Sequence, residues 1–320
     1  MSVLILAETS EGVFKKSAIE VTAYGKKVAE QLGTNTVVLA INSTNPSDLY
    51  AYGAEKVLNV SNENLKTFNA KVYANIIQQA AEKENATVVI IDSNANGLYV
   101  APIVAVNLKA GYASNVVALP SETTPFTVKR KAFSSKGFNN TQINTEVKVI
   151  ALSKNSFGIV EAPVTGTTEE FVPTLIDASI TSEKIEQTTG TITIADADIV
   201  VSGGRGLKGP ENWGMIEELA KVLGAATACS KPVSDLGWRP HSEHVGQTGK
   251  PVASNLYIAI GISGAIQHLA GINSSKVKVV INTDAEAPFF KAADYGIVGD
   301  AFEVVPKLIE KLKEFKTNNA

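Results

Sequence analysis

Residues 198–208 read Asp198-Ile199-Val200-Val201-Ser202-Gly203-Gly204-Arg205-Gly206-Leu207-Lys208, an apolar strand followed at once by a glycine-rich turn. A helical pattern then runs from about Glu211 to Leu223, and Gly224 marks its predicted end. Residues 256–268 repeat the arrangement and read Leu256-Tyr257-Ile258-Ala259-Ile260-Gly261-Ile262-Ser263-Gly264-Ala265-Ile266-Gln267-His268. Glycine lets the backbone turn sharply and lets a ligand approach, and the helix N-terminus that follows favours an anion. Two such turns around one crevice predict a site for a large cofactor with several negative charges.

Length and composition set the outer bounds. A chain of 320 residues exceeds the size at which one core usually stops growing, so we expect two domains. The net charge of −3 leaves no basic footprint for nucleic acid, and the single cysteine, Cys229, excludes an internal disulfide. No Cys/His cluster has metal-site spacing, and no apolar run is long enough for membrane insertion. Because the N-terminus lacks the basic region of a signal peptide, we expect a cytoplasmic protein.

The N-terminal half alternates short apolar runs with amphipathic helices. The predicted strands are Val3–Ala7, Thr36–Ile41, Lys56–Val60, Thr87–Asp92 and Asn115–Leu119. The predicted helices are Lys15–Leu32 and Asn69–Glu84. This succession indicates right-handed crossovers and an open, mostly parallel α/β sheet. Two further stretches, Phe126–Phe133 and Thr141–Leu152, alternate apolar and polar side chains and predict an antiparallel addition.

The domain boundary is predicted near the end of a segment with weak periodicity. Residues 153–190 are rich in Thr, Ser, Gly and Pro, so we assign residues 1–190 to an N-terminal α/β domain and residues 191–320 to a C-terminal parallel α/β domain. The first strand of the N-terminal domain leads to Glu8-Thr9-Ser10-Glu11-Gly12, which lacks the spaced glycines of a dinucleotide fingerprint. We therefore interpret this domain as a scaffold or a docking surface for a partner.

The two glycine turns supply candidate binding residues. Arg205 lies in the first turn, where its fork of donors can pair with phosphate; a tight turn with an exposed arginine is the simpler alternative. A helix that starts at Ser263 or Gly264 places Gln267 and His268 one turn in, with side chains that lean toward its N-terminus. A histidine there can donate a hydrogen bond to a developing anion, and a capping or core histidine fits the pattern as well.

Two polar features follow other predicted strands. Residues 245–250 resemble a phosphate loop but fail the test, because Pro251 stands where Ser or Thr should bind magnesium. A polar loop that touches a ligand through its backbone and the Thr248 hydroxyl is the interpretation that remains. Asn282 and Asp300 follow apolar strands and therefore occupy the edge at which ligands of open α/β sheets lie.

The remaining aromatic and histidine residues of this half invite simpler interpretations. His241 and His244 lie in a polar stretch and are expected at the surface. Trp213 and Trp238 are expected in hydrophobic packing.

Four segments of the C-terminal half together resemble one known family. They are Gly203-Gly204-Arg205-Gly206-Leu207-Lys208, Val245-Gly246-Gln247-Thr248-Gly249-Lys250, Gly261-Ile262-Ser263-Gly264-Ala265-Ile266-Gln267-His268-Leu269-Ala270-Gly271, and Glu286-Ala287-Pro288 followed by Ala293-Asp294-Tyr295-Gly296-Ile297-Val298-Gly299-Asp300. In order and spacing they closely resemble the alpha subunit of electron-transfer flavoprotein over essentially all of this half. The N-terminal half is similar in layout and length, with weaker motifs.

The resemblance implies a function and partners. It implies a heterodimer with a beta subunit, an FAD held mainly by the C-terminal domain of this chain, and AMP in the beta subunit. Electrons would enter from flavin-dependent dehydrogenases, such as those that act on acyl-CoA in fatty acid beta-oxidation, and leave to a quinone oxidoreductase. The chain would then be an electron carrier and not an enzyme.

The resemblance also implies a set of cofactor-binding residues. Arg205 and Ser230 would contact the anionic part of the cofactor or its surroundings, Val245, Gly246, Gln247 and Thr248 would line the flavin, Ser263, Gly264, Ala265, Ile266, Gln267 and His268 would bind through the helix start, and Asn282 and Asp300 would hold the adenosine end. Within this set, Thr248 would lie near flavin N5 and His268 near the pyrimidine carbonyl. Lys231 departs from the family, which usually has arginine there, and lysine keeps the charge but loses the planar fork.

Three alternatives stay open at this point. A bifurcating member of the same family would hold a second FAD in the beta subunit in place of AMP. An NAD-dependent enzyme on a related domain would need placed acid–base chemistry, for which His268 is the strongest candidate. An adenylate-binding protein built on the first domain is disfavoured by the missing fingerprint.

Overall fold

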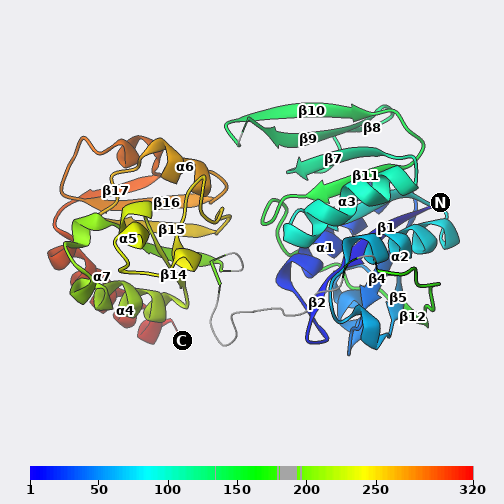
Figure 1. Ribbon diagram of the computed structural model, residues 1–320, viewed down its shortest axis with the longest axis horizontal. Coiled ribbons are helices and arrows are strands. Elements are labelled where there is room, and N and C mark those ends of the chain that lie inside the picture. The colour runs from blue at the N-terminus through cyan, green and yellow to red at the C-terminus, as the bar shows by residue number, and fades with distance from the viewer. Residues whose placement is uncertain (134, 179, 181–192, 195–196, 320) are drawn as a thin grey trace. The chain divides into compact units, whose positions relative to one another are not determined.

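The computed structural model describes residues 1–133, 135–178, 180, 193–194 and 197–319, and the boundary predicted at residue 190 lies outside them. The chain divides into two compact units, Met1–Phe133 with Gly137–Ile185 and Ser134–Lys136 with Glu186–Ala320. Each unit combines helices with a mostly parallel sheet, which confirms the predicted fold class (Figure 1). Among the residues that the structure describes, no helix has the length and apolar character needed to cross a membrane.

The first unit is built on a ten-stranded sheet. Its strands are β1 (Ser2–Ala7), β4 (Asn35–Ile41), β5 (Lys56–Val60), β6 (Ala86–Asp92), β7 (Gly111–Val116), β8 (Glu122–Thr123), β9 (Phe126–Ala132), β10 (Gly137–Ile143), β11 (Lys148–Leu152) and β12 (Thr167–Glu170). They lie in the order β10-β9-β7-β11-β6-β1-β4-β5-β12, with β8 beside β9. In the part of this order that runs β7-β11-β6-β1-β4-β5-β12, every neighbouring pair is parallel. The pairs that β9 forms with β7, β8 and β10 are antiparallel. Strands β2 (Thr9–Ser10) and β3 (Val13–Phe14) form a separate hairpin.

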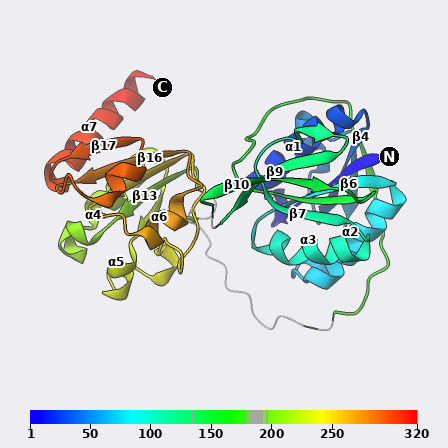
Figure 2. The same cartoon turned by 90° about the horizontal axis from the view of Figure 1, so that it is seen from above.

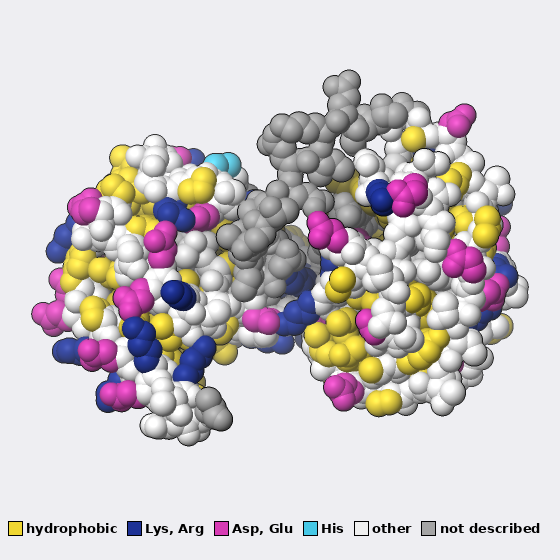
Figure 3. Space-filling view, turned by 90° about the horizontal axis from the view of Figure 1, so that it is seen from below, with side chains coloured by type: hydrophobic (Ala, Val, Ile, Leu, Met, Phe, Trp, Pro, Cys, Tyr) yellow, Lys and Arg dark blue, Asp and Glu magenta, His cyan; other side chains and the backbone are white. Residues whose placement is uncertain are grey.

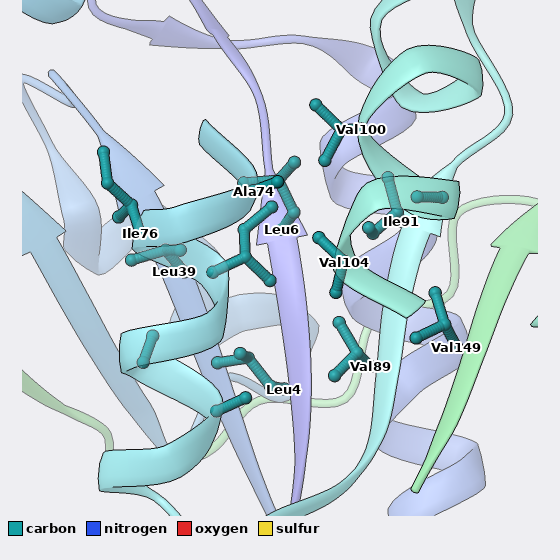
Figure 4. Close-up of a cluster of buried hydrophobic side chains, with 14 of the residues drawn as sticks. Leu4, Leu6, Leu39, Ala74, Ile76, Val89, Ile91, Val100, Val104 and Val149 are labelled. Carbon is teal, nitrogen blue, oxygen red and sulfur yellow. The ribbon is translucent and has the colours of Figure 1, made fainter. Parts of the chain in front are cut away.

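Helices cover both faces of this sheet, which explains the nearly continuous apolar strands. Helix α1 (Lys16–Leu32) lies on one side, and α2 (Ala70–Lys83) and α3 (Ala95–Asn107) lie on the other (Figure 2). Successive side chains of β1 alternate between the faces, so Val3 and Ile5 pack with α1. Leu4 and Leu6 pack under α2 and α3 (Figure 4). All four side chains are buried.

The structure corrects two of the predicted strands. Residues 141–152 do not form one antiparallel strand, because β10 ends at Ile143 and β11 pairs in parallel with both β6 and β7. The run Val149–Leu152 is fully buried, as a central parallel strand requires. Strand β7 begins at Gly111, four residues before the predicted Asn115, and Asn115 itself has a positive φ of 56° beside a break in register.

Helix α3 and strand β12 are among the elements of the first unit that have no counterpart in the predicted set. Helix α3 is apolar on all sides, so its sequence shows no amphipathic stripe. It also contains Pro102, a residue that disfavours a helix interior. Its start is capped by the Asn94 side chain, which accepts a hydrogen bond from the Gly97 N–H at 2.9 Å. Strand β12 lies in the segment predicted to be irregular and extends the sheet beyond β5. Its Glu169 forms ion pairs of 2.8 Å with Lys56 and Lys83.

The second unit has a five-stranded, fully parallel sheet. Its strands are β13 (Ile199–Gly203), β14 (Ala226–Cys229), β15 (Leu256–Ile260), β16 (Val277–Asn282) and β17 (Tyr295–Val298). Its helices are α4 (Gly214–Leu223), α5 (Lys231–Asp235), α6 (Ile266–Ile272) and α7 (Ala301–Asn318), with short 3₁₀ turns η3 (Arg205–Leu207), η4 (Pro210–Asn212), η5 (His241–Glu243) and η6 (Pro288–Ala292). The strand order is β14-β13-β15-β16-β17, so the direction of winding reverses between β13 and β15.

Two hydrophobic clusters hold this sheet. Helices α4 and α7 pack on one face, where the buried Trp213 confirms the expected role in packing. On the other face Tyr257, Phe289 and Ile272 form the core of the second cluster. Helix α4 ends at Gly224 in the left-handed conformation, with φ of 67°, as the sequence predicted.

Candidate functional site

A pocket of the second unit lies at the carboxyl edge of its sheet. A cavity of about 320 Å³ forms there, close to the point where the winding reverses between β13 and β15. It is lined by Arg205, Gly206, Ser230, Lys231, Gly261, Ile262, Ser263, Gly264, Ala265, His268, Asn282 and Asp284. These residues follow four different parallel strands, which is the arrangement in which open α/β sheets bind their ligands.

The two glycine turns pack backbone against backbone. The N–H of Gly204 donates to the carbonyl of Ile260 at 2.8 Å, and the N–H of Gly206 donates to the carbonyl of Gly261 at 3.0 Å. A Cβ on Gly204 would collide with the Gly261 carbonyl oxygen, and one on Gly206 would lie 2.8 Å from Gly261 Cα. Gly261 has a φ of 64°. Glycine is therefore required on both sides of this contact, and the contact brings the two predicted motifs to one cavity.

Helix α6 begins later than predicted. Its first residue is Ile266 and its N-cap is Ala265, whereas the sequence pattern predicted a start at Ser263 or Gly264. Gly264 has a φ of 85°, and a Cβ there would lie 2.6 Å from the Phe289 backbone nitrogen. The Phe289 N–H also donates to the Ser263 carbonyl at 3.0 Å. This close approach by η6 holds residues 263–264 outside the helix.

His268 is both a core residue and a wall of the cavity. It is 6% exposed, and its Nε2 lies 2.9 Å from the Tyr257 hydroxyl oxygen, within a hydrogen bond. Burial, with the neighbouring His244, lowers the pKa of His268 to about 4. The ring is therefore neutral at pH 7, so it can contribute a hydrogen bond to a ligand but not a full charge.

Charged side chains at the cavity are mainly basic. Arg205 is exposed at the end of the first glycine turn, as predicted. Lys231 begins α5, and its ammonium lies 3.3 Å from the Asp235 carboxylate. Asp284 supplies one negative charge, and one of its oxygens accepts a hydrogen bond from the Glu286 N–H at 3.0 Å. Two cationic side chains and two hydroxyls suit an anionic ligand.

Residues 245–248 lie beside the cavity rather than among its lining residues. The Gln247 N–H donates to the Gln267 carbonyl at 2.8 Å, and the Val245 N–H donates to the Cys229 carbonyl at 3.0 Å. The segment is thus attached to α6 and to the end of β14. Ile266 and Gln267 belong to α6 and also do not line the cavity.

Asn282 and Asp300 have local structural roles. The Asn282 amide donates to the Ile262 carbonyl at 3.1 Å, and its oxygen accepts from the Asp284 N–H at 3.0 Å. These bonds join the loops after β15 and β16. Asp300 caps α7 by accepting from the Phe302 N–H at 2.9 Å, and it does not line the cavity.

Several features of the site were not predicted. The cavity is also lined by Gly206, Gly261 and Ile262, which lie in the predicted glycine turns but were not among the predicted binding residues, and by Asp284, which was not predicted. Asp284 could have been found from its place two residues after the end of a parallel strand.

The prediction that His244 lies at the surface is wrong, because its side chain is 1% exposed. His241 is exposed, as expected. Within the described ranges, no group of three or more His, Cys, Asp or Glu side chains could hold a metal ion.

Comparison with known proteins covers both units. Residues 3–176 match the family model of the electron transfer flavoprotein domain, and residues 193–273 match that of the electron transfer flavoprotein FAD-binding domain. The second match includes both glycine turns and His268.

Individual relatives agree over the full length. Electron transfer flavoprotein subunit alpha of Bacillus subtilis is 36% identical over 322 residues, which cover 99% of each chain. The subunit alpha of Thermoanaerobacterium thermosaccharolyticum is also 36% identical, over 98% of each chain. Protein FixB of Clostridium saccharobutylicum is 33% identical over 98% of this chain and 96% of its own length. Both domain models and these full-length identities show that the chain belongs to the alpha-subunit family of electron transfer flavoproteins.

Proposed function

We propose that this chain binds one FAD at the carboxyl edge of its second sheet and, with a beta subunit, carries electrons between redox proteins. The observation that carries the proposal is the backbone contact between the two glycine turns, in which Gly204 and Gly206 pack against Gly261. This contact lies where the winding of the sheet reverses, and Arg205 and Lys231 line the same cavity. The donors would be flavin-dependent dehydrogenases of the acyl-CoA dehydrogenase type, and the acceptor a quinone oxidoreductase. The protein would act in the cytoplasm.

The residues present fit this cofactor. FAD supplies the electron-carrying ring when it is bound, and this chain supplies the surroundings. The exposed guanidinium of Arg205 would hold the diphosphate, because its fork of donors suits phosphate oxygens, and the glycine turns would let the diphosphate approach the backbone closely. Ser230, Ser263 and the neutral His268 would supply directed hydrogen bonds. Asn282 would stabilise the wall of the cavity by joining the loops after β15 and β16.

The other proposed contacts come from the implied binding set. Val245, Gly246, Gln247 and Thr248 would approach the flavin from their loop beside α6. Gly264, Ala265, Ile266, Gln267 and Asp300 complete the set with Lys231. The family name supports a beta subunit as the partner, and AMP would be bound there.

Exposed apolar surface on the first unit supports a docking role. Figure 3 shows apolar side chains gathered on one face of this unit. Large apolar side chains of the first unit are well exposed, among them Val13, Tyr99 and Val106. Extended apolar surface of this kind is typical of sites that bind another protein. We propose that the first unit contacts the beta subunit and holds no ligand of its own.

Co-expression with the beta subunit tests the function directly. The purified complex should be yellow, contain one FAD and one AMP, and pass electrons from a reduced acyl-CoA dehydrogenase to a quinone oxidoreductase. A complex with two FAD would support the bifurcating alternative. A complex without flavin absorbance would contradict the proposal.

The low pKa of His268 argues against an NAD-dependent enzyme. A general base is most effective when its pKa lies near the working pH, whereas that of His268 is about 4. Its Nε2 is also engaged by the buried Tyr257 hydroxyl. A dehydrogenase assay with NAD and the free chain should therefore show no turnover.

A further inference from the structure

His244 occupies the inside of the turn that follows it. The Lys250 N–H donates to the His244 carbonyl at 2.8 Å, and the Gly249 N–H donates to the Gly246 carbonyl at 3.0 Å. A Cβ on Gly249 would lie 2.9 Å from Nδ1 of the His244 ring, and one on Gly246 would lie 3.4 Å from its Nε2. The imidazole is 1% exposed. The turn is therefore closed around this ring.

The turn is attached to the walls of the cavity at both of its sides. Val245 bonds to the carbonyl of Cys229, whose neighbour Ser230 lines the cavity. Gln247 bonds to the carbonyl of Gln267, whose neighbour His268 lines the cavity. Movement of the His244 ring would therefore displace the polar loop relative to the cavity.

The surroundings of His244 favour an uncharged ring. Its Nδ1 is buried and has no hydrogen-bond partner among the residues that the structure describes. The titratable groups around it are His241 with a ring centroid 5.1 Å away, Lys231 and Asp235 on α5, His268 on α6 and Cys229 at the end of β14. Burial, then His241 and Lys231, lower the pKa of His244, and only Asp235 opposes them. Cys229 stays an uncharged thiol, because burial raises its pKa to about 12.

We propose that His244 is a positioning residue of the cofactor site, which holds the Val245–Thr248 loop in its binding position only while the imidazole is neutral. A protonated ring inside the turn has two donors and finds no acceptor at Nδ1, so it must leave the turn or expand it. The inference deepens the proposed function, since it assumes that FAD is the ligand of this site. In this proposal His244 positions the loop, and the loop, not His244, contacts the cofactor.

The test measures FAD affinity from pH 8 to pH 5 in the flavin-free complex of this chain with its beta subunit. If only the form with a neutral His244 ring binds FAD, the apparent Kd of the wild type should rise about tenfold for each pH unit below the pKa of His244. His244→Gln, which has no titrating ring, should bind with nearly the same Kd throughout. His241→Gln is the matched control, because that histidine is adjacent and exposed. Since His241 lowers the pKa of His244, this variant should keep the wild-type slope, with the rise in Kd starting at a higher pH. His268, with a pKa of about 4, does not titrate in this range.

The outcomes separate the inference from the proposed function. The inference is supported if the Kd of His244→Gln stays constant while that of the wild type rises toward pH 5. It is overturned if the Kd of that variant rises with the same slope as the wild type. A wild type that binds FAD equally well at every pH, although its His244 ring titrates within that range by NMR, also overturns it, whereas a wild type that binds no FAD at pH 8 contradicts the proposed function instead. NMR titration of the His244 ring gives a second measurement without a variant. By linkage its pKa must fall when FAD binds, and an unchanged pKa would refute the inference.

Discussion

The Nε2 atom of His268 lies 2.9 Å from the hydroxyl oxygen of Tyr257, and the two side chains are buried together beneath the cavity. Phe289 stacks on the Tyr257 ring with a centroid distance of 6.5 Å. This pair links the wall of the cavity to the core of the sheet. The same histidine can thus contribute to ligand binding and to the stability of the unit.

The first prediction concerns this pair. His268→Ala removes one hydrogen-bond partner of the buried Tyr257 hydroxyl and opens space beside it, so the free energy of unfolding should fall by about 2–4 kcal/mol. Tyr257→Phe, which removes only the hydroxyl, should cost about 1–2 kcal/mol. Urea unfolding of both variants and of the double variant gives the coupling energy. Additive costs, within about 0.3 kcal/mol, would show that the hydrogen bond contributes nothing.

The second prediction concerns the contact between the glycine turns. Gly204→Ala places a methyl group against the Gly261 carbonyl, and that carbonyl belongs to the backbone, so it cannot move cheaply. We expect a loss of about 1–3 kcal/mol in stability together with weaker FAD binding. Gly214→Ala is the control, because a Cβ there meets nothing within 4 Å, and it should be neutral or slightly stabilising. Thermal unfolding and flavin retention of the two variants compare these cases, and equal behaviour would refute the packing argument.

The third prediction concerns Lys231. Its side chain is 58% exposed and pairs with Asp235, so its charge acts on the cofactor through water. A unit charge at about 4 Å in bulk water is worth about 1 kcal/mol, which corresponds to about 40 mV for one electron. Lys231→Ala should therefore lower the first reduction potential of bound flavin by up to about 40 mV, and Lys231→Arg should change it less. Potentiometric titration measures both, and an alanine variant identical to the wild type would place the ammonium away from the flavin.

The fourth prediction concerns the first unit and its pH dependence. Burial chiefly, with help from Glu8 and Glu20, raises the pKa of Asp92 to about 6 against the opposing effects of Ser17 and Lys154. Folding therefore favours the protonated carboxyl. Its stabilising contribution is complete below the ordinary pKa near 3.8 and is lost as the pH rises through 6.

Asp92→Asn stays neutral and should gain stability relative to the wild type between pH 4 and pH 7. The gain should be on the order of 3 kcal/mol, from the size of the pKa shift. The exposed Glu122→Gln on β8 serves as the control and should show no such trend. Parallel stability curves for the wild type and Asp92→Asn across this range would contradict the prediction.

Local pattern predicted the regular elements well where one face or both faces of an element were plainly apolar. Strand β5 (Lys56–Val60) has the predicted bounds, and α1 and α2 differ from theirs by one residue at the ends. Pattern failed for α3, because a helix that is apolar all round has no stripe to detect. It failed for β11 because alternation says nothing about which strand will be the neighbour.

The cofactor site divides in the same way. The glycine motifs and Arg205 were visible as residues of the chain, because glycine and a guanidinium have chemical properties that do not depend on distant neighbours. The late start of α6 was not visible, since it depends on Phe289, which approaches Gly264 from another part of the chain.

Residue types and their spacing were thus sufficient for the α/β class, the two glycine turns and the family. Contacts between residues far apart in the sequence determined the rest: the Gly206–Gly261 hydrogen bond that joins the turns, the Tyr257 partner of His268, and the burial of His244 inside its turn. The physical reason is that backbone conformation and hydrophobic pattern are local properties. Burial, hydrogen-bond partners and pKa values depend on whatever side chains the folded chain brings together.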